Sequence, residues 1–315
     1  MIFELSLYSI KFRESVQVNC VTRISVSAVS PIANVSDYAD NSQMQFAAIR
    51  YLCAAILFVG VSGTTALAAE DGMVGIPGGH FTMGSDHGLS DEGPAHTVEL
   101  PAFLIDRVPV TNARFAEFLN ARGWRDANGR RYYDIDDGDA RIHRHNGRFN
   151  ADTGFGDHAV NESSWLGALE YCRSKGKRLP TEAEWERAAR GALGREFPWG
   201  DETPSARHAR FAFGWNETAP VGTYPVGATP EGIFDLAGNV HEWTSSLYRP
   251  YPYRPDDGRE VPDPDVPGER VTRGGGHDSP AEELRAAWRG DGVSRNPRAG
   301  HRNIGFRCAK NIPGA

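Results

Sequence analysis

The chain has 315 residues, with 34 basic and 41 acidic side chains that give a formal net charge of -7. The Lys and Arg residues are scattered and form no basic stripe, which argues against a nucleic-acid-binding protein. The 35 glycines and 20 prolines divide the sequence into short pieces, so we expect a fold rich in loops.

Residues 44–69 have the pattern of an export signal. Arg50 supplies a positive charge, an apolar run follows at 51–61, and small residues at 66–68 form a cleavage site. The run is too short to span a bilayer as a stable helix. We therefore expect export to the bacterial periplasm, with no stable membrane insertion after cleavage; the alternative is an uncleaved anchor.

The segment before the signal is expected to be an over-extended start. Residues 1–43 show no strong hydrophobic periodicity and end just before Met44, from which a conventional signal peptide would begin. The remaining residues 70–315 are long enough to bury a core, and a single domain is predicted.

Three segments combine an apolar face at helical spacing with a start signal. The first begins at Thr111 and the second near Ser164, both of which can cap a helix. The third begins with Thr181 and Glu184 in the spacing of a capping box. The apolar face of the second helix includes Cys172, so we expect its sulfur to point toward the core.

Strands are predicted at 73–83, 97–105, 270–274 and 303–309, where β-branched and apolar residues gather. A further short helix is expected from residue 279, before a strand near Leu284. Strands and helices do not alternate as they do in a parallel sheet. The predicted class is therefore α+β with much coil.

Cys172 and Cys308 are the cysteines that remain after the leader is removed. An even number of cysteines in an exported protein predicts a disulfide. The alternative is a pair of thiolate ligands for a soft metal, which would require both sulfurs to stay reduced in an oxidising compartment.

The acidic run at 134–139 offers several carboxylates to a cation. It lacks the residue order of an EF-hand loop, so a solvated surface loop is the favoured interpretation. His143 and His145 follow, and at this spacing they would face one side of a strand. No third ligand is evident near them, and we expect exposed polar residues.

Six segments in a fixed order carry a resemblance to a known family. They are GMVGIPGGHFTMGS at 72–85, DRVPVTNARFAEFL at 106–119, SSWLGALEYCRSKGKRLPTEAEWERAARG at 163–191, FPWGD at 197–201, IFDLAGNVHEWTSS at 233–246, and RVTRGGG with IGFRCA at 270–309. Together they resemble the formylglycine-generating enzyme, or sulfatase-modifying factor, family. The resemblance implies a coil-rich α+β fold related to C-type lectins, and a structural disulfide between Cys172 and Cys308.

The same resemblance implies a calcium site in the loop 235–242. Its ligands would be the side chains of Asp235 and Glu242 and the backbone carbonyls of Gly238 and Val240. A hard cation prefers oxygen ligands of these kinds. The alternative is a solvated acidic turn that binds no ion.

Copper is not expected. The family oxidises a substrate cysteine with molecular oxygen through copper that is bound by two cysteine thiolates. The corresponding positions fall at or near Ser279 and Leu284, and neither side chain can replace a thiolate for Cu(I), which is soft and favours sulfur.

A pocket of other residues would take the place of the thiolates: His277, Asp278, Ser279, Arg285, Trp288 and Arg289. A carboxylate can orient an imidazole for acid–base chemistry, but adjacent strand residues point to opposite faces. The alternative is structural: the two arginines pair with carboxylates and Trp288 packs in the core.

Two functions remain open. The first is an exported oxidative maturation or accessory factor that acts on a peptide, a protein or a siderophore precursor without copper, as the resemblance to the periplasmic pyoverdine-maturation branch implies. The second is a non-catalytic, lectin-like module that binds a peptide, a glycan or a redox partner. The sequence assigns no substrate and no catalytic residue.

Overall fold

The computed structural model describes residues 72–290 and 296–314, and the described residues belong to one compact unit. None of the helices in this part of the chain is long and apolar enough to cross a membrane. The expected start at 1–43 and the export signal at 44–69 lie outside the described residues and stay predictions.

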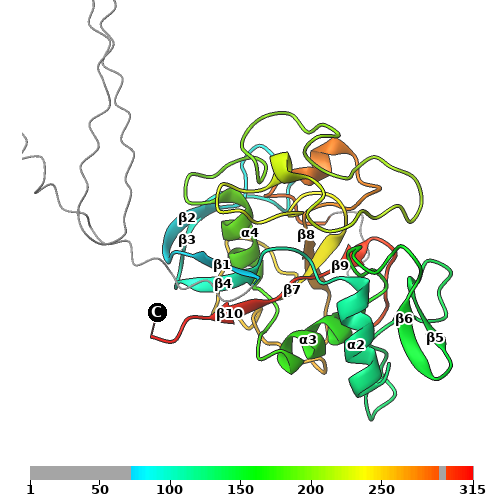
Figure 1. The fold of residues 1–315 in the computed structure, drawn as a ribbon. Coiled ribbons are helices and arrows are strands. Elements are labelled where there is room, and N and C mark those ends of the chain that lie inside the picture. The colour runs from blue at the N-terminus through cyan, green and yellow to red at the C-terminus, as the bar shows by residue number, and fades with distance from the viewer. Residues whose placement is uncertain (1–71, 291–295, 315) are drawn as a thin grey trace, which may run out of the picture. The chain divides into compact units, whose positions relative to one another are not determined.

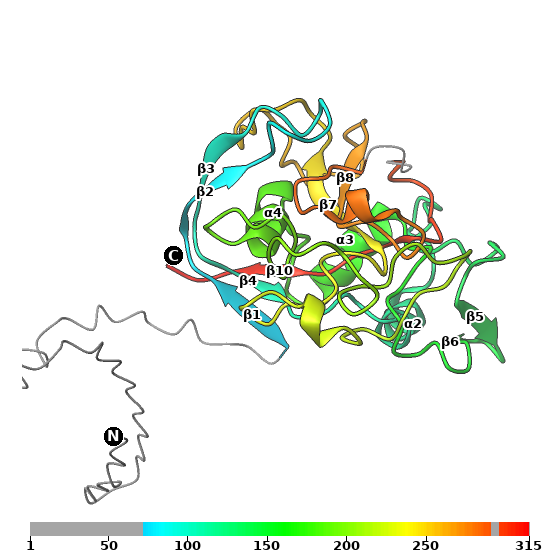
Figure 2. The ribbon, with the colours of Figure 1, turned by 90° about the horizontal axis from the view of Figure 1, so that it is seen from above.

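Two small antiparallel sheets are built from the first strands and the last one. β1 (Met73–Ile76), β4 (Phe103–Asp106) and β10 (Ala309–Asn311) form one sheet in the order β1-β4-β10. This sheet contains both the first and the last strand of the described residues. β2 (Gly79–Met83) pairs with β3 (His96–Leu100) in a second sheet. The views agree that β2 and β3 lie at one end of the unit (Figures 1 and 2).

The other strands form a hairpin and a central sheet. β5 (Ile142–His145) pairs with β6 (Arg148–Ala151). This hairpin lies beside the helix α2 (Asn112–Arg122), at the opposite end from β2 and β3 (Figures 1 and 2). The central sheet has β7 (His241–Leu247) between β8 (Arg270–Arg273), which is antiparallel to it, and β9 (Ile304–Gly305), which is parallel.

The three predicted helices are confirmed as α2 (Asn112–Arg122), α3 (Trp165–Ser174) and α4 (Glu182–Arg190). Each begins after the expected capping residue. In the capping box of α4, the Thr181 hydroxyl accepts a hydrogen bond from the Glu184 N–H at 3.1 Å, and the Glu184 carboxylate accepts one from the Thr181 N–H at 2.9 Å. These bonds satisfy two backbone donors at the helix start.

The fold is α+β and rich in coil, as predicted. The predicted strands at 73–83 and 97–105 are each divided in two. The chain turns between β1 and β2 and again between β3 and β4, and these two turns contact each other. A Cβ atom on Gly78 would lie 2.8 Å from the backbone nitrogen of Ala102, so glycine permits this approach. Short 3-10 helices cover Pro225–Gly227 and Ala281–Leu284.

The prediction of a strand near Leu284 was wrong. This residue ends the second 3-10 helix, and coil follows it. Pro280 precedes this helix, and Glu282 and Glu283 lie in its first turn, where carboxylates interact favourably with the helix dipole.

Cys172 and Cys308 form a disulfide, with 5.6 Å between their Cα atoms. Both side chains are buried in an aromatic core cluster that includes Phe115, Trp165 and Phe306. The bond joins α3 to the segment before β10. The predicted pairing is confirmed.

Candidate functional site

The loop that follows β8 places the predicted pocket residues beside the start of β7. Gly274 and Gly275 have φ values of 98° and 71°, which are strained for residues with side chains. A Cβ atom on Gly274 would lie 3.0 Å from the Trp185 ring and 3.1 Å from the carbonyl oxygen of Leu236. The glycines therefore let the backbone pass closely over α4 before it reaches His277.

Two histidines and a serine lie close together where this loop passes the first residue of β7. The Ser279 hydroxyl accepts a hydrogen bond from the Gly276 N–H at 3.0 Å and lies 3.3 Å from Nε2 of His241. Nδ1 of His277 lies 3.1 Å from the carbonyl oxygen of Asn239. His241, the first residue of β7, is a site residue that the sequence analysis did not single out.

Each of these histidines keeps one ring nitrogen without a hydrogen-bond partner: Nδ1 of His241 and Nε2 of His277. Burial lowers the pKa of His241 to about 3, although the charge of Asp278 acts in the opposite direction. Burial also lowers the pKa of His277. Both rings are therefore neutral near pH 7, and each can hydrogen-bond a group that reaches its unpaired nitrogen.

The low pKa of His241 predicts a loss of stability in acid. An unfolded histidine binds a proton near pH 6.5, whereas the buried ring does so only near its folded pKa of about 3. Between these values the unfolded state binds more protons, so stability falls as the pH drops. At about pH 4.5 we expect the free energy of unfolding to be roughly 2–3 kcal/mol lower than at neutral pH from this group alone.

Urea unfolding near neutral pH and at about pH 4.5 measures this loss. A His241→Asn variant should lose less stability between the two conditions than the native chain, by about the same 2–3 kcal/mol. Equal losses in the two proteins would contradict the role assigned to His241.

Asp278 does not form a working pair with His277. Its carboxylate instead accepts hydrogen bonds from Arg302 at 3.0 Å and from Asn303 at 3.1 Å. Burial raises the pKa of Asp278, but the Asn303 hydrogen bond and the charge of Arg302 act in the opposite direction, and the pKa lies below its usual range. Asp278 therefore carries a negative charge near the two neutral rings.

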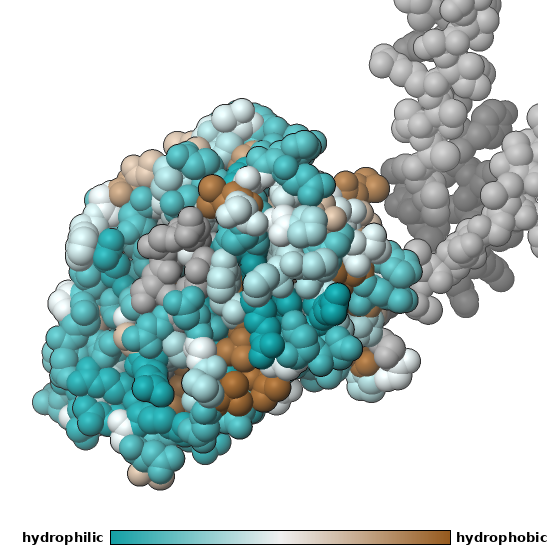
Figure 3. Space-filling model, turned by 180° about the vertical axis from the view of Figure 1, so that it is seen from behind, coloured by the Kyte–Doolittle hydropathy of each residue, from teal (hydrophilic) through white to brown (hydrophobic). Residues whose placement is uncertain are grey.

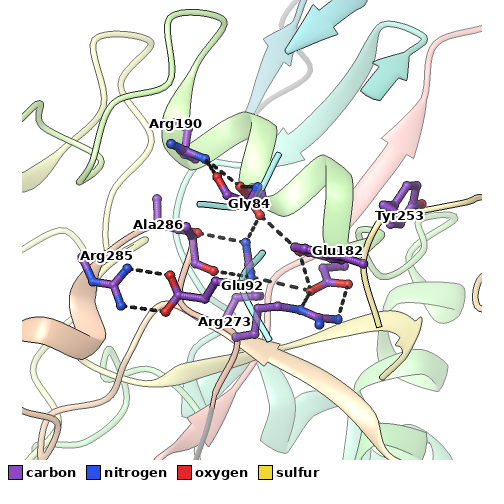
Figure 4. A network of polar contacts seen from close by, with 12 residues as sticks. Gly84, Glu92, Glu182, Arg190, Tyr253, Arg273, Arg285 and Ala286 are labelled. Carbon is purple, nitrogen blue, oxygen red and sulfur yellow. Dashed lines mark hydrogen bonds and ion pairs between the residues drawn. The ribbon is translucent and has the colours of Figure 1, made fainter. Parts of the chain in front are cut away.

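Arg285 and Arg289 are structural, as the alternative interpretation predicted. Arg285 binds the Glu92 carboxylate with two hydrogen bonds of 2.6 Å, and Arg289 binds Glu182 at 2.7 and 3.1 Å. The Glu92 and Glu182 side chains lie in a larger polar network around α4 (Figure 4). Trp288 is buried, and its ring centroid lies 5.4 Å from that of His241.

The residues of the predicted calcium loop have other partners. Both carboxylate oxygens of Glu242 are bound by Arg307, at 2.7 and 2.6 Å, and Trp185 donates a further hydrogen bond at 2.8 Å. Asp235 accepts a hydrogen bond from the Gly222 N–H at 2.7 Å. Because a guanidinium already neutralises Glu242, these contacts do not favour an ion there, and the calcium ligands Asp235, Gly238, Val240 and Glu242 stay a prediction.

A cavity of about 360 Å³ is lined by other residues, and no sequence motif predicts it. Its lining includes Trp165, Pro264, Arg270 and Arg298. The Arg270 guanidinium lies 4.0 Å from the centre of the Trp165 ring and donates hydrogen bonds to backbone carbonyls. The volume is within the range of ligand pockets, and the combination of an indole with guanidinium groups suits a peptide side chain or another polar ligand.

Comparison with known proteins identifies the family of this chain. The family model of the sulfatase-modifying factor enzyme 1-like domain matches residues 60–312. The chain belongs to this family. A formylglycine-generating enzyme of Streptomyces coelicolor is 38% identical over 285 residues, which cover 76% of this chain and 88% of that enzyme.

Other members of the family differ in length and in the names they carry. The serine/threonine-protein kinase pkn1 of Chlamydia pneumoniae is 40% identical over 246 residues, but these cover 38% of that protein and 76% of this chain. The structure of PvdO from Pseudomonas aeruginosa has a TM-score of 0.57 and 27% identity, and the match covers 76% of this chain and 94% of PvdO. The match to the PvdO structure confirms the family fold.

Proposed function

We propose that this family member is an exported maturation or accessory factor that acts on a peptide or protein partner without thiolate-bound copper. The observation that carries the proposal is the state of the cysteines. Cys172 and Cys308 are bonded to each other, and the sequence has no other cysteine after residue 53. The domain therefore offers no free thiolate to Cu(I).

The positions that the resemblance gives to the copper ligands are occupied by other structural interactions. The Ser279 hydroxyl is hydrogen-bonded within its own loop. Leu284 is fully buried and packs with Phe197, Ala209 and Ala237. A hydroxyl and an aliphatic side chain provide no soft ligand. These contacts support the proposal that this loop does not hold copper through these two residues.

Two neutral imidazoles remain, beside the charged Asp278, and they define what this site could do. His241 and His277 are 1% and 0% exposed, and their unpaired nitrogens could hydrogen-bond a polar group of a substrate that enters this buried loop. Any oxidation would use molecular oxygen as the oxidant and would draw its redox centre from the bound partner. The name of one relative, a formylglycine-generating enzyme, supports a role in the modification of a peptide or protein. Figure 3 shows a mainly hydrophilic face with a few small apolar areas, which suits a transient partner.

Crosslinking in the periplasm, followed by an oxygen-uptake assay on the captured peptide or protein, tests the proposal. If the loop is catalytic, His277→Asn should reduce oxygen uptake about 100-fold or more. The matched control is His145→Asn on the exposed end of β5, which should leave the uptake unchanged. Thermal unfolding of both variants shows whether they fold.

The same assay separates the two functions that the sequence left open. A binding module would retain its peptide, glycan or redox partner without consuming oxygen, and His277→Asn would change affinity alone. Equal oxygen uptake by the native chain and His277→Asn would count against a catalytic role for this loop.

A further inference from the structure

Three carboxylates from separate segments converge at a place distinct from the site described above. Ligand oxygens of Asp137, Asp139 and Glu162 all lie within 4.8 Å of one another. The acidic run at 134–139 lacks the EF-hand order, and a solvated loop was therefore the favoured interpretation. Nothing in the sequence shows that Glu162 approaches this run. The loop is instead folded against the segment that leads into α3.

Glu162 is the unusual member of this cluster. Its residue is 2% exposed, and Oε2 has no hydrogen-bond partner. Its backbone is held on both sides: the Glu162 N–H donates to the carbonyl oxygen of His301 and its carbonyl oxygen accepts from the Asp134 N–H, each at 3.0 Å. The φ of Glu162 is 55°, which is uncommon for a residue with a side chain. The fold thus fixes a buried, unpaired carboxyl group next to two other carboxylates, an arrangement that is costly unless something compensates it.

Asp139 is also fixed in place. Its carbonyl oxygen accepts hydrogen bonds from the side-chain amides of Asn161 and Asn216, both at 2.9 Å. One carboxylate oxygen accepts a hydrogen bond from the Trp215 indole at 2.7 Å. The backbone N–H of Asp139 donates to the Asp137 carboxylate at 2.8 Å. These bonds order the loop around the cluster before any ligand binds.

We propose that Asp137, Asp139 and Glu162 bind a hard divalent cation, with Ca²⁺ as the preferred ion. Oxygens that coordinate one Ca²⁺ at about 2.3–2.6 Å can be no more than about 5 Å apart, and the separations in the cluster meet this limit. Carboxylates are the ligands that such ions prefer, and backbone carbonyls or water can complete the coordination. A cation would give the unpaired Oε2 of the buried Glu162 side chain a partner.

The electrostatics of the cluster agree with this geometry. Burial and the charges of Asp137, Asp134 and Asp139 raise the pKa of Glu162 to about 8, while the more distant Arg302 acts in the opposite direction. Arg131, the nearby cation on the same loop, is paired with Asp134 and Asp136. With its raised pKa, Glu162 is largely protonated near pH 7 when no cation is bound, and a cation that binds here would displace this proton.

Binding here would also order the loop at the candidate functional site. The Trp215 indole donates a hydrogen bond to Asp139, and the guanidinium carbon of Arg302 lies 3.7 Å from the centre of the Trp215 ring. Arg302 in turn donates a hydrogen bond of 3.0 Å to Asp278. In the same loop as Trp215, the N–H of Phe213 donates to the carbonyl oxygen of His277 at 2.8 Å. The cation site is thus connected to the histidine loop through Trp215.

Terbium luminescence provides a specific test, because an indole lies beside the proposed ion. We expect the chelated full chain to bind Tb³⁺ with emission sensitised by tryptophan, and to show a higher thermal midpoint with Ca²⁺. Trp215→Phe should lose most of the sensitised emission and keep the Ca²⁺-dependent rise in the midpoint. Glu162→Gln should lose both effects.

Two further variants keep the test independent of folding. Asp137 is exposed, so Asp137→Asn should fold normally and bind Ca²⁺ about 10-fold or more weakly. Asp256 is exposed and lies outside both candidate calcium loops, so Asp256→Asn makes the same acid-to-amide change and should retain the native response. The proposal is overturned if the native chain shows no response to Ca²⁺, if Glu162→Gln retains the full response, or if Asp256→Asn alone abolishes it.

Discussion

Replacing Cys172 and Cys308 together with alanine is expected to lower the free energy of unfolding by about 5 kcal/mol. The disulfide joins residues separated by 136 positions, and so long a loop restricts the unfolded chain strongly in the chain-entropy model. Both sulfurs are buried in the aromatic core, and their loss also removes packing. Denaturant unfolding of the native and the double-alanine chains measures the difference.

Reduction of the native protein is the matched control, because it opens the bond without changing the side chains. Reduction should reproduce most of the loss found for the double variant. A difference below about 1 kcal/mol in both experiments would show that this bond is not a main source of stability.

Glu186→Gln is expected to lower the free energy of unfolding by about 3–5 kcal/mol. Glu186 and Arg273 are fully buried and form an ion pair, and Arg273 also lies 3.6 Å from Glu182. Glu186 further accepts hydrogen bonds from the Gly84 N–H at 2.7 Å and from Arg190 at 3.1 Å. Neutralising this carboxylate leaves much of the buried positive charge of Arg273 without compensation.

An exposed pair on α3 provides the control for this change. Glu170 and Arg173 are 2.8 Å apart, with side-chain exposures of 31% and 46%. Glu170→Gln should therefore change the free energy of unfolding by about 0.5 kcal/mol or less. Similar losses from Glu186→Gln and Glu170→Gln in chemical denaturation would contradict the importance of the buried network.

Features encoded by nearby residues could be predicted from the sequence. The capping box is formed by Thr181 and Glu184, which lie in the same helical turn. Their spacing in the sequence was therefore enough to predict the start of α4. β7 was missed for a physical reason: all seven of its residues are buried, so it lacks the alternation of a strand with one solvated face.

The site depended on contacts between distant residues and was predicted only in part. The resemblance directed attention to His277 and Ser279, but the His241 ring reaches Ser279 from another strand, 38 positions away. Glu162 likewise reaches Asp139 only through the packing of its segment. The interpretation of Arg285 and Arg289 as ion-paired residues was confirmed, although their partners Glu92 and Glu182 lie too far along the chain to be identified from the sequence.

The most direct test of the central claim is the conversion of a cysteine-containing sulfatase peptide to formylglycine, measured by mass spectrometry with Cu(I) and oxygen present. The Streptomyces coelicolor formylglycine-generating enzyme serves as the positive control. A Ser279→Cys, Leu284→Cys double variant tests whether thiols at these positions restore Cu(I) binding, as the resemblance predicts. We predict that the native chain leaves the peptide cysteine unchanged and does not take Cu(I) from a competing chelator. Formylglycine produced by the native chain would contradict a function without thiolate-bound copper.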